Sequence, residues 1–192
     1  MIVIKIGGSL YSSDYLKEWL NNLASVNSQK IIIVPGGGLF ADQVRSAASE
    51  YNLSDEISHH MAVLAMQQYG YLLADLNKNI TFLDSYANSL TNNQIYVWMP
   101  YKDVTHACDF PKNWQTTSDS LAVWLAKEMD AKHLCLIKSA ELTEESSEQL
   151  INSEIVDDYF PVAVKEYPGF IHFFHASQSM HFLNQFEHGK FS

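Results

Sequence analysis

The first residues suited to chemistry follow a short apolar run at the start of the chain. Lys5, Gly7, Gly8 and Ser9 lie in the stretch IVIKIGGS. Successive glycines let backbone N–H groups approach a phosphate closely, and a lysine neutralises charge on a transferring phosphoryl group. We therefore predict phosphate contacts at the glycines and Ser9, and a catalytic role for Lys5. The alternative is a glycine turn beside a solvated lysine, since the chain contains no Walker motif.

A second glycine turn, Gly36-Gly37-Gly38, follows Pro35 and the apolar run IIIV. Three successive glycines are costly in conformational entropy, so they suit backbone that must lie against a ligand or another loop. The helical pattern that follows carries Arg45, the only arginine of the chain, and its guanidinium is suited to grip a carboxylate or phosphate bidentately. We predict phosphate contacts at the three glycines and an acceptor contact at Arg45. The alternative is a flexible turn and a surface arginine.

A third group begins with Thr117, Ser118 and Asp119 at the start of a helical pattern, and is completed by Lys138 after the run LCLI. The polar residues form a good helix N-cap, which is the commoner explanation of such a run. The functional hypothesis makes Asp119 and Lys138 catalytic, with Asp119 orienting the lysines or contacting metal-bound nucleotide. Thr117 and Ser118 would contact phosphate. No metal ligand from a protein side chain is predicted.

Two adjacent histidines, His59 and His60, lie on a long helical pattern and face different directions, so they are unsuited to chelating one metal. We predict that His60 contacts the acceptor, against the alternative of a surface or packed histidine. Ring-bearing residues further along would either cover a ring-bearing substrate or pack in a loop. They are Trp98, Tyr101, His106, Phe110 and Trp114.

The elements that must position these residues alternate between strand and helix patterns. Strands are predicted at 2–6, 31–34, 80–84, 94–99, 133–137 and 170–174. Helices are predicted at 14–24, 39–50, 55–76, 118–129 and 177–187, with a loop at 100–117 and a short helix or loop at 141–153. This order favours an α/β fold with a mainly parallel sheet, whose ligands gather at the carboxyl ends of the strands.

Composition excludes several classes of function. The 192 residues carry a formal net charge of −10, which argues against a nucleic acid partner because phosphate backbones require a basic face. No apolar stretch approaches membrane-spanning length. The two cysteines lack metal-ligand spacing and favour a reducing compartment. We therefore expect a cytoplasmic protein with one domain, residues 1–192.

Taken in order, these motifs resemble the amino acid kinase superfamily. The match comprises strand-K-x-G-G-S, strand-P-G-G-G, T-T-S-D-S-x-A at a helix start, and a strand that ends in lysine. The resemblance implies an αβα sandwich that transfers the γ-phosphoryl group of ATP, with Mg²⁺, to a small acceptor. It also implies an acceptor lobe near 1–110, a reduced nucleotide lobe near 111–192, and a homodimer, formed through the long helix, or a higher homo-oligomer.

A narrower resemblance covers roughly residues 1–160. The segments PGGGLFADQVR, HHMAVLAMQQYGYLLA, VWMPY, WQTTSDSLAVWLA and IVDDYFP are similar to small archaeal and methylotroph kinases linked to methanofuran synthesis. It implies that the acceptor is a phosphate monoester, aminomethylfuranyl-methyl phosphate, which becomes a diphosphate. The positions carried over are Lys5, Gly7, Gly8, Gly37, Gly38, Asp119 and Lys138.

One departure from the superfamily pattern keeps other functions open. A D-x-x-G-[VI] loop usually follows the last lysine, whereas residues 139–143 read SAELT and contain no glycine. Rival hypotheses are therefore a uridylate-like or carboxylate kinase, a degenerate fold that binds a nucleotide or metabolite without transfer, and an interaction module that uses the 55–76 helix.

Overall fold

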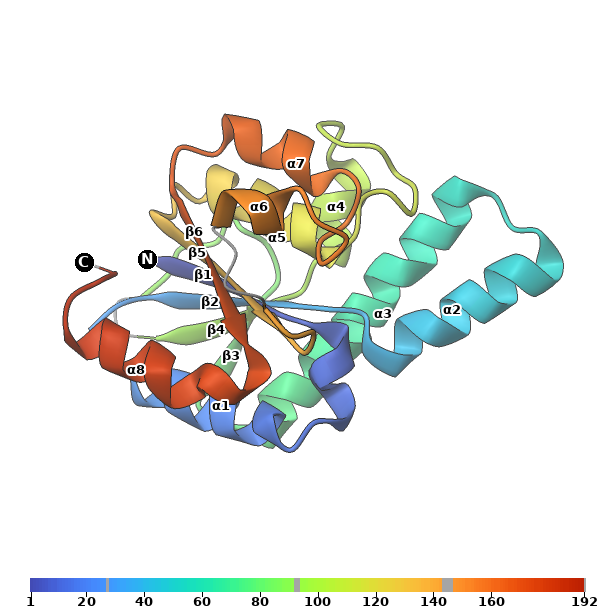
Figure 1. Ribbon diagram of the computed structural model, residues 1–192. Helices are drawn as coiled ribbons and strands as arrows, with labels where there is room; N and C mark the ends of the chain where they lie inside the picture. Colours follow the sequence, from blue (N-terminus) through green and yellow to red (C-terminus); the bar gives the residue numbers. More distant parts are fainter. Residues whose placement is uncertain (27, 92–93, 143–146, 192) are drawn as a thin grey trace.

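A six-stranded sheet forms the centre of the molecule, with helices on both of its faces (Figure 1). This computed structural model describes residues 1–26, 28–91, 94–142 and 147–191. Neighbouring strands pair in parallel in the order β3-β4-β2-β1-β5-β6. The three-layer αβα sandwich predicted from the sequence is therefore confirmed, and its sheet is parallel at every described pairing.

The elements have the following bounds. The strands are β1 (Ile2–Ile6), β2 (Ile31–Pro35), β3 (Ile80–Leu83), β4 (Ile95–Trp98), β5 (His133–Lys138) and β6 (Phe170–His175). The α-helices are α1 (Tyr15–Ser25), α2 (Gly38–Tyr51), α3 (Asp55–Leu76), α4 (Tyr101–His106), α5 (Ser118–Glu128), α6 (Ser147–Ile151), α7 (Phe160–Ala163) and α8 (Ser179–Glu187). Three 3-10 helices complete the description: η1 (Gly8–Ser12), η2 (Val164–Glu166) and η3 (Ala176–Gln178).

Two hydrophobic cores cover the sheet, one on each face, because successive side chains of a strand point in opposite directions. On one face, α1 and α8 pack against strand residues such as Ile4. Trp19 of α1 is fully buried there, and its indole Nε1 donates a hydrogen bond to the Ala176 carbonyl at 2.6 Å. On the other face, α5 and α7 cover residues such as Val3.

The same alternation directs Lys5 and Lys138 to the face covered by α5. Lys5 follows Val3 by two residues, and Lys138 follows Leu136 by two residues, so each lysine shares a face with a residue of the α5 core. The register pairs Lys5 with Leu136, which places both lysines near the carboxyl ends of adjacent strands. The chain leaves β1 toward β2 on one side and leaves β5 toward β6 on the other. Such a divergence creates a crevice where ligands bind.

The turn after β1 packs directly against the turn after β2. The Gly36 backbone N–H donates to the Ile6 carbonyl at 2.9 Å. A Cβ added at Gly36 would lie 2.4 Å from the backbone nitrogen of Gly8, and one added at Gly8 would lie 2.5 Å from that of Gly38. Glycine is therefore required for the two turns to meet, independently of any ligand.

Asp157 holds the start of α5 in place from 40 residues further along the chain. Its carboxylate accepts hydrogen bonds from the backbone N–H groups of Thr117 at 2.9 Å, Ser120 at 3.0 Å and Phe160 at 3.0 Å. It also accepts from the hydroxyls of Thr117, at 2.8 Å, and Ser120. A carboxylate is favourable at a helix N-terminus because it satisfies unpaired N–H groups and the positive end of the dipole. Asp157 thereby fixes the helix turn that carries Asp119.

Two of the predicted segments differ in the structure, and a third, 141–153, contains the short helix that was one of its two predicted alternatives. The segment 100–117, predicted as a loop, contains α4, a helix of six residues that is too short to show an apolar period. The predicted helix at 177–187 divides into η3 and α8. Within 141–153 the structure has α6, while residues 143–146 lie outside the described residues.

The Asp157 cap yields a stability prediction. Asp157→Ala should lower the free energy of unfolding by about 2–4 kcal/mol, because it removes a helix cap and several charge-assisted hydrogen bonds. Chemical denaturation of the wild type and of the variant measures this change in the free energy of unfolding. The neighbouring Asp158 is exposed, so Asp158→Ala should change stability by no more than about 0.5 kcal/mol. Equal stability of the two variants would contradict the role of Asp157.

Candidate active site

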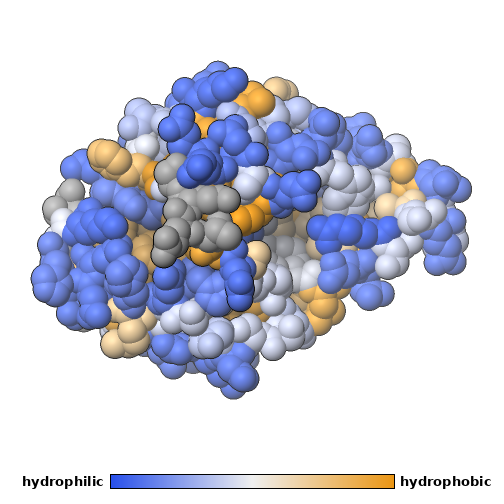
Figure 2. Space-filling model, in the orientation of Figure 1, coloured by the Kyte–Doolittle hydropathy of each residue, from blue (hydrophilic) through white to orange (hydrophobic). Residues whose placement is uncertain are grey.

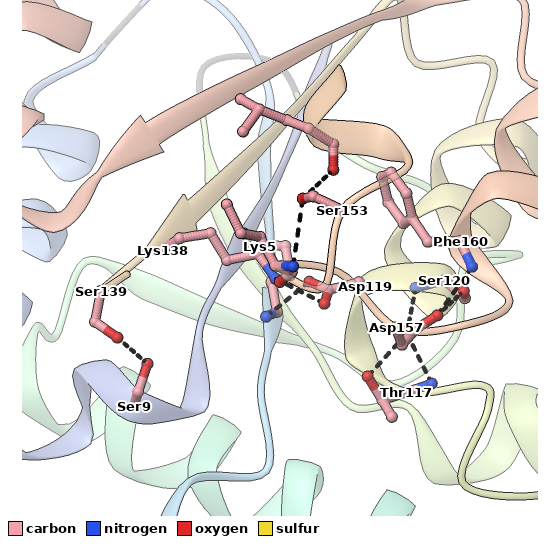
Figure 3. Close-up of polar contacts among 12 residues, drawn as sticks. Lys5, Ser9, Thr117, Asp119, Ser120, Lys138, Ser139, Ser153, Asp157 and Phe160 are labelled. Carbon is pink, nitrogen blue, oxygen red and sulfur yellow. Dashed lines mark hydrogen bonds and ion pairs between the residues drawn. The ribbon is translucent and has the colours of Figure 1, made fainter. Parts of the chain in front are cut away.

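Lys5 and Lys138 converge on the carboxylate of Asp119 (Figure 3). Lys5 Nζ lies 2.9 Å from Asp119 Oδ1, and Lys138 Nζ lies 2.7 Å from Asp119 Oδ2. Lys138 also donates to the backbone carbonyl of Ile155 at 2.7 Å. The three side chains come from β1, α5 and β5, and their residues are only 4%, 5% and 8% exposed. The structure thus brings together the three residues that the sequence proposed as catalytic.

These three residues leave one positive charge unbalanced in a buried place, since two ammonium groups share one carboxylate. Burial is the main cause that lowers the pKa of Lys138 to about 8, the charge of Lys5 lowers it further, and Asp119 opposes both. Burial would raise the pKa of Asp119, but the charges of Lys5 and Lys138 outweigh it and hold that pKa below its usual value. A buried excess charge is costly without a counter-charge, so the trio is suited to receive an anion.

A cavity of about 330 Å³ opens beside Lys5 and is lined by residues of α2, α3 and the start of α5. The helices α2 and α3 project from the sheet as a pair (Figure 1), and the surface is hollowed beside them (Figure 2). The volume of this cavity is at the lower end of the range for small-ligand sites. Its apolar wall includes Val63, Met66 and Leu121. Its polar lining residues are Lys5, Gly8, Ser9, Gly37, Gly38, Asp42, Arg45, His59, Trp114, Thr116, Thr117 and Ser118.

The predicted phosphate contacts divide into two groups. Gly8, Ser9, Gly37, Gly38, Thr117 and Ser118 line the cavity. Gly7 and Gly36 are not among its lining residues; a Cβ on Gly36 would strike Gly8, and one on Gly7 would lie 3.0 Å from the Ile137 carbonyl. Both glycines therefore have a packing role. The Thr117 hydroxyl already donates to Asp157, so it is not a free donor for phosphate.

Ser9 joins the cavity to the segment after β5. Its hydroxyl lies 2.6 Å from the hydroxyl of Ser139, which directly follows Lys138 (Figure 3). Residues 139–142 occupy the place where the superfamily pattern has its D-x-x-G loop, and Thr143 lies outside the described residues. The two hydroxyls thereby link the first glycine turn to the end of the strand that carries Lys138.

Arg45 lies at the wall of the cavity, as predicted for an acceptor contact, but it already has two partners. Its guanidinium lies 2.7 Å from Asp42 Oδ1 and 5.3 Å from the ring centre of Trp114. The Arg45 side chain is 54% exposed, so the ion pair with Asp42 is solvent-screened and contributes little to stability. Arg45 and Trp114 together form a polar edge of the cavity, where an acceptor could bind.

The histidine that lines the cavity is His59, whereas His60 is not among the lining residues. The cavity therefore meets α3 one position before the residue that was predicted to contact the acceptor. His59 shares its side of the helix with Val63 and Met66, which lie four and seven residues further on. The sequence carried this spacing, but it did not show which side of α3 faces a cavity and which packs elsewhere.

Of the five ring-bearing residues predicted either to cover a substrate or to pack in a loop, Trp114 lines the cavity. Trp98 is fully buried, and its Nε1 donates to Asp103 at 2.8 Å. Phe110 is buried against Trp124, with ring centres 5.6 Å apart. His106 lines a separate cavity beside Trp124, and Tyr101 opens α4. Packing therefore accounts for Trp98 and Phe110.

Sequence reasoning missed His59, Thr116 and Asp157. Thr116 is buried and lines the cavity, directly before the N-cap of α5. Asp157 lies in the stretch IVDDYFP, which in the sequence indicates only a resemblance to a kinase group and no role for the residue. The polar run Thr116–Ser120 indicated a capped helix, but a cap supplied from 40 residues away leaves no local pattern.

In residues 1–26, 28–91, 94–142 and 147–191, no cluster of three or more histidine, cysteine, aspartate or glutamate side chains is arranged to hold a metal ion. Over the same ranges, no helix has both the length and the hydrophobicity needed to cross a membrane.

Comparison with known proteins agrees with this geometry. The chain is 28% identical over 181 residues to [5-(aminomethyl)furan-3-yl]methyl phosphate kinase of Methanocaldococcus jannaschii, covering 87% of this chain and 84% of the relative. This match confirms the narrower resemblance found in the sequence.

Solved structures support the fold. Uridylate kinase from Archaeoglobus fulgidus superposes with a TM-score of 0.71 at 14% identity, covering 95% of both chains. UMP kinase from Bacillus anthracis has a TM-score of 0.68 at 13% identity, covering 99% of this chain and 92% of the other. The model of the amino acid kinase family matches residues 1–142, and the chain therefore belongs to this family of small-molecule kinases.

Proposed function

We propose that the protein transfers the γ-phosphoryl group of ATP to a phosphate monoester and so forms a diphosphate. The observation that carries this proposal is the buried trio Lys5, Asp119 and Lys138 beside a cavity lined by glycine turns. Phosphoryl transfer requires alignment of the two reacting oxygens and positive charge around the transferred group. The trio supplies the charge, and the turns after β1 and β2 supply backbone close to a ligand.

In this mechanism an oxygen of the acceptor phosphate forms a bond to the γ-phosphorus while the bond to the bridging oxygen of ADP breaks. A phosphate monoester dianion has no proton to lose, so the step needs no general base. Lys5 stabilises charge on the transferred group from the cavity side, and Lys138 does so from the end of β5. Asp119 positions both ammonium groups, since each of its carboxylate oxygens holds one of them.

Mg²⁺ would be carried by the phosphate oxygens of the nucleotide, because Asp119 is already shared by two lysines. When bound it neutralises charge on the phosphates and aligns them. Ser9 and Ser139 lie where the nucleotide and acceptor would meet, and their hydroxyls could donate to phosphate once their mutual hydrogen bond opens.

The choice of acceptor follows from the comparison with known proteins. The relative from Methanocaldococcus jannaschii is named for [5-(aminomethyl)furan-3-yl]methyl phosphate, and we propose this compound as the first acceptor to test. A cavity of about 330 Å³ with an apolar wall fits a small ring with a phosphate at one end. The acceptor would bind in the lobe near 1–110, and the nucleotide would bind beside Lys138 in the lobe near 111–192.

We also propose a cytoplasmic homodimer. Ile57, Leu64 and Tyr71 of α3 are 50%, 40% and 53% exposed, which is unusual for large apolar side chains on one helix. Light scattering in solution should therefore give twice the monomer mass. The mass of a single chain at micromolar concentration would contradict the dimer.

Replacement of either lysine tests the reaction. Lys5→Ala and Lys138→Ala should each lower kcat by roughly 10²–10³-fold, the usual effect of removing one preorganised donor to developing charge. ADP release is measured with the furan acceptor, with UMP and with a carboxylate acceptor, and circular dichroism checks the fold. Lys127→Ala is the matched control because Lys127 is an exposed partner of Glu166. Near-normal turnover in either variant would contradict the mechanism, and ATP binding without ADP release for every acceptor would favour a non-catalytic binder.

The pKa of Lys138 predicts the pH dependence. Because that pKa is lowered to about 8, kcat/KM should fall as pH rises through about 8, where the free enzyme loses the Lys138 charge. Phosphate bound nearby favours the charged form, so the corresponding fall in kcat should lie at higher pH. In Lys138→Arg the charge persists, and any remaining activity should lack this alkaline fall. The same fall in the arginine variant would exclude Lys138 as its source.

A further inference from the structure

Two buried polar atoms in the cavity lack a partner among the described residues. They are Nε2 of His59 and Oγ1 of Thr116. His59 is 3% exposed, Thr116 is 2% exposed, and both line the cavity. A buried polar atom without a hydrogen bond is costly, and native proteins rarely keep one without a use. Two such atoms in one cavity therefore indicate a ligand that completes their hydrogen bonds.

The carbonyl of Asn113 determines what kind of group His59 can bind. This oxygen lies 3.3 Å from His59 Nδ1 and accepts a hydrogen bond from the Thr116 backbone N–H at 3.2 Å. A carbonyl only accepts, so Nδ1 must carry the proton that it donates. In a neutral imidazole the other nitrogen then has a bare lone pair. The Nε2 of His59, a residue that lines the cavity, is therefore a buried hydrogen-bond acceptor without a partner among the described residues.

The surroundings favour the neutral imidazole. Burial is the main cause that lowers the pKa of His59, and the charge of nearby Lys112 lowers it further, while the bond to Asn113 opposes them. A lone pair at Nε2 would repel a carboxylate, a phosphate or a ring carbonyl. It would attract the hydrogens of an ammonium group, which has three donors and no acceptor.

The position of His59 separates this subsite from the reacting phosphate. The helix α3 runs inward from its projecting N-terminus toward the sheet (Figure 1). His59 precedes Met66 by seven residues, which is about 10 Å along a helix at 1.5 Å per residue. Val63 and Met66, which follow His59 along α3, are apolar residues that line the same cavity as Gly8, Gly37 and Gly38. An acceptor that lies along these two apolar residues would place its phosphate beside Lys5 and its far end beside His59.

We propose that His59 Nε2 and Thr116 Oγ1 form a subsite that binds a primary ammonium group at the end of the acceptor remote from its phosphate. This inference rests on the proposed function for the direction in which the acceptor lies. It makes His59 and Thr116 specificity-determining residues that act on acceptor binding. It also disfavours an acceptor that places a ring carbonyl oxygen, such as one of uracil, beside the lone pair of His59 Nε2.

The test compares two acceptors that differ only in the amine. One is [5-(aminomethyl)furan-3-yl]methyl phosphate, and the other carries a methyl group in place of the aminomethyl group. Calorimetry without ATP should show that the wild type binds the amine about 10- to 100-fold more tightly, as expected for hydrogen bonds to a charged group. His59→Phe and Thr116→Val should each lose much of this preference and leave affinity for the methyl analogue within about threefold. His59→Gln should restore part of it.

His60 supplies the matched comparison, because it is the adjacent residue of the same type and lies outside the cavity lining. A loss of amine preference in His60→Phe, with none in His59→Phe, would overturn the assignment. Equal weakening of both acceptors by His59→Phe, or no preference in the wild type, would also overturn it.

Nitrogen-15 NMR of the wild-type histidines provides a readout that does not depend on variant folding. The structure predicts that neutral His59 carries its proton on Nδ1, and a proton on Nε2 would contradict the subsite. If the wild type binds the amine selectively but releases no ADP with either acceptor, the kinase proposal fails and the ammonium subsite stands.

Discussion

The site depends on one electrostatic constraint: two buried ammonium groups share a single carboxylate. Neither lysine would be stable at its position without Asp119, because a desolvated charge needs a counter-charge. Asp119 in turn keeps its position because Asp157 caps the helix turn that carries it. The arrangement remains one positive charge in excess, and burial, together with the charge of Lys5, lowers the pKa of Lys138 to about 8. A polyphosphate is the ligand that would relieve this imbalance.

The sheet determines where this charge can form. Lys5 and Lys138 reach the same face because each follows a core residue of the α5 face by two positions along its strand. They are adjacent because β1 and β5 are neighbours at the point where the chain connections diverge. A shift of one residue in the register of β5 would turn Lys138 into the opposite core. The apolar residues of that strand, buried on both faces, hold the register in place.

Much of this arrangement could be predicted from the sequence. The β-branched runs, the glycine turns and the capped helix at Thr117 are local patterns, so they indicated both the elements and the ends at which Lys5 and Lys138 lie. The resemblance to a kinase family then placed the lysines in one site. The rest depends on contacts distant in sequence. Asp157 caps a helix whose N-cap lies 40 residues earlier, and His59 rather than His60 lines the cavity because of how α2 and the segment that holds Asn113 pack beside α3. Gly36 likewise packs directly against Gly8. From the sequence alone, both glycines were assigned to ligand contact.

Proton uptake during nucleotide binding tests the central claim most directly. Binding of a non-hydrolysable ATP analogue with Mg²⁺ is measured by calorimetry at pH 8, in buffers that differ in ionisation enthalpy. The account predicts uptake of protons by the wild type, because the phosphate charge raises the pKa of Lys138 from about 8. Lys138→Met should show much less uptake. Binding with equal proton uptake in both proteins would contradict the claim that a buried excess charge at Lys138 receives the phosphate.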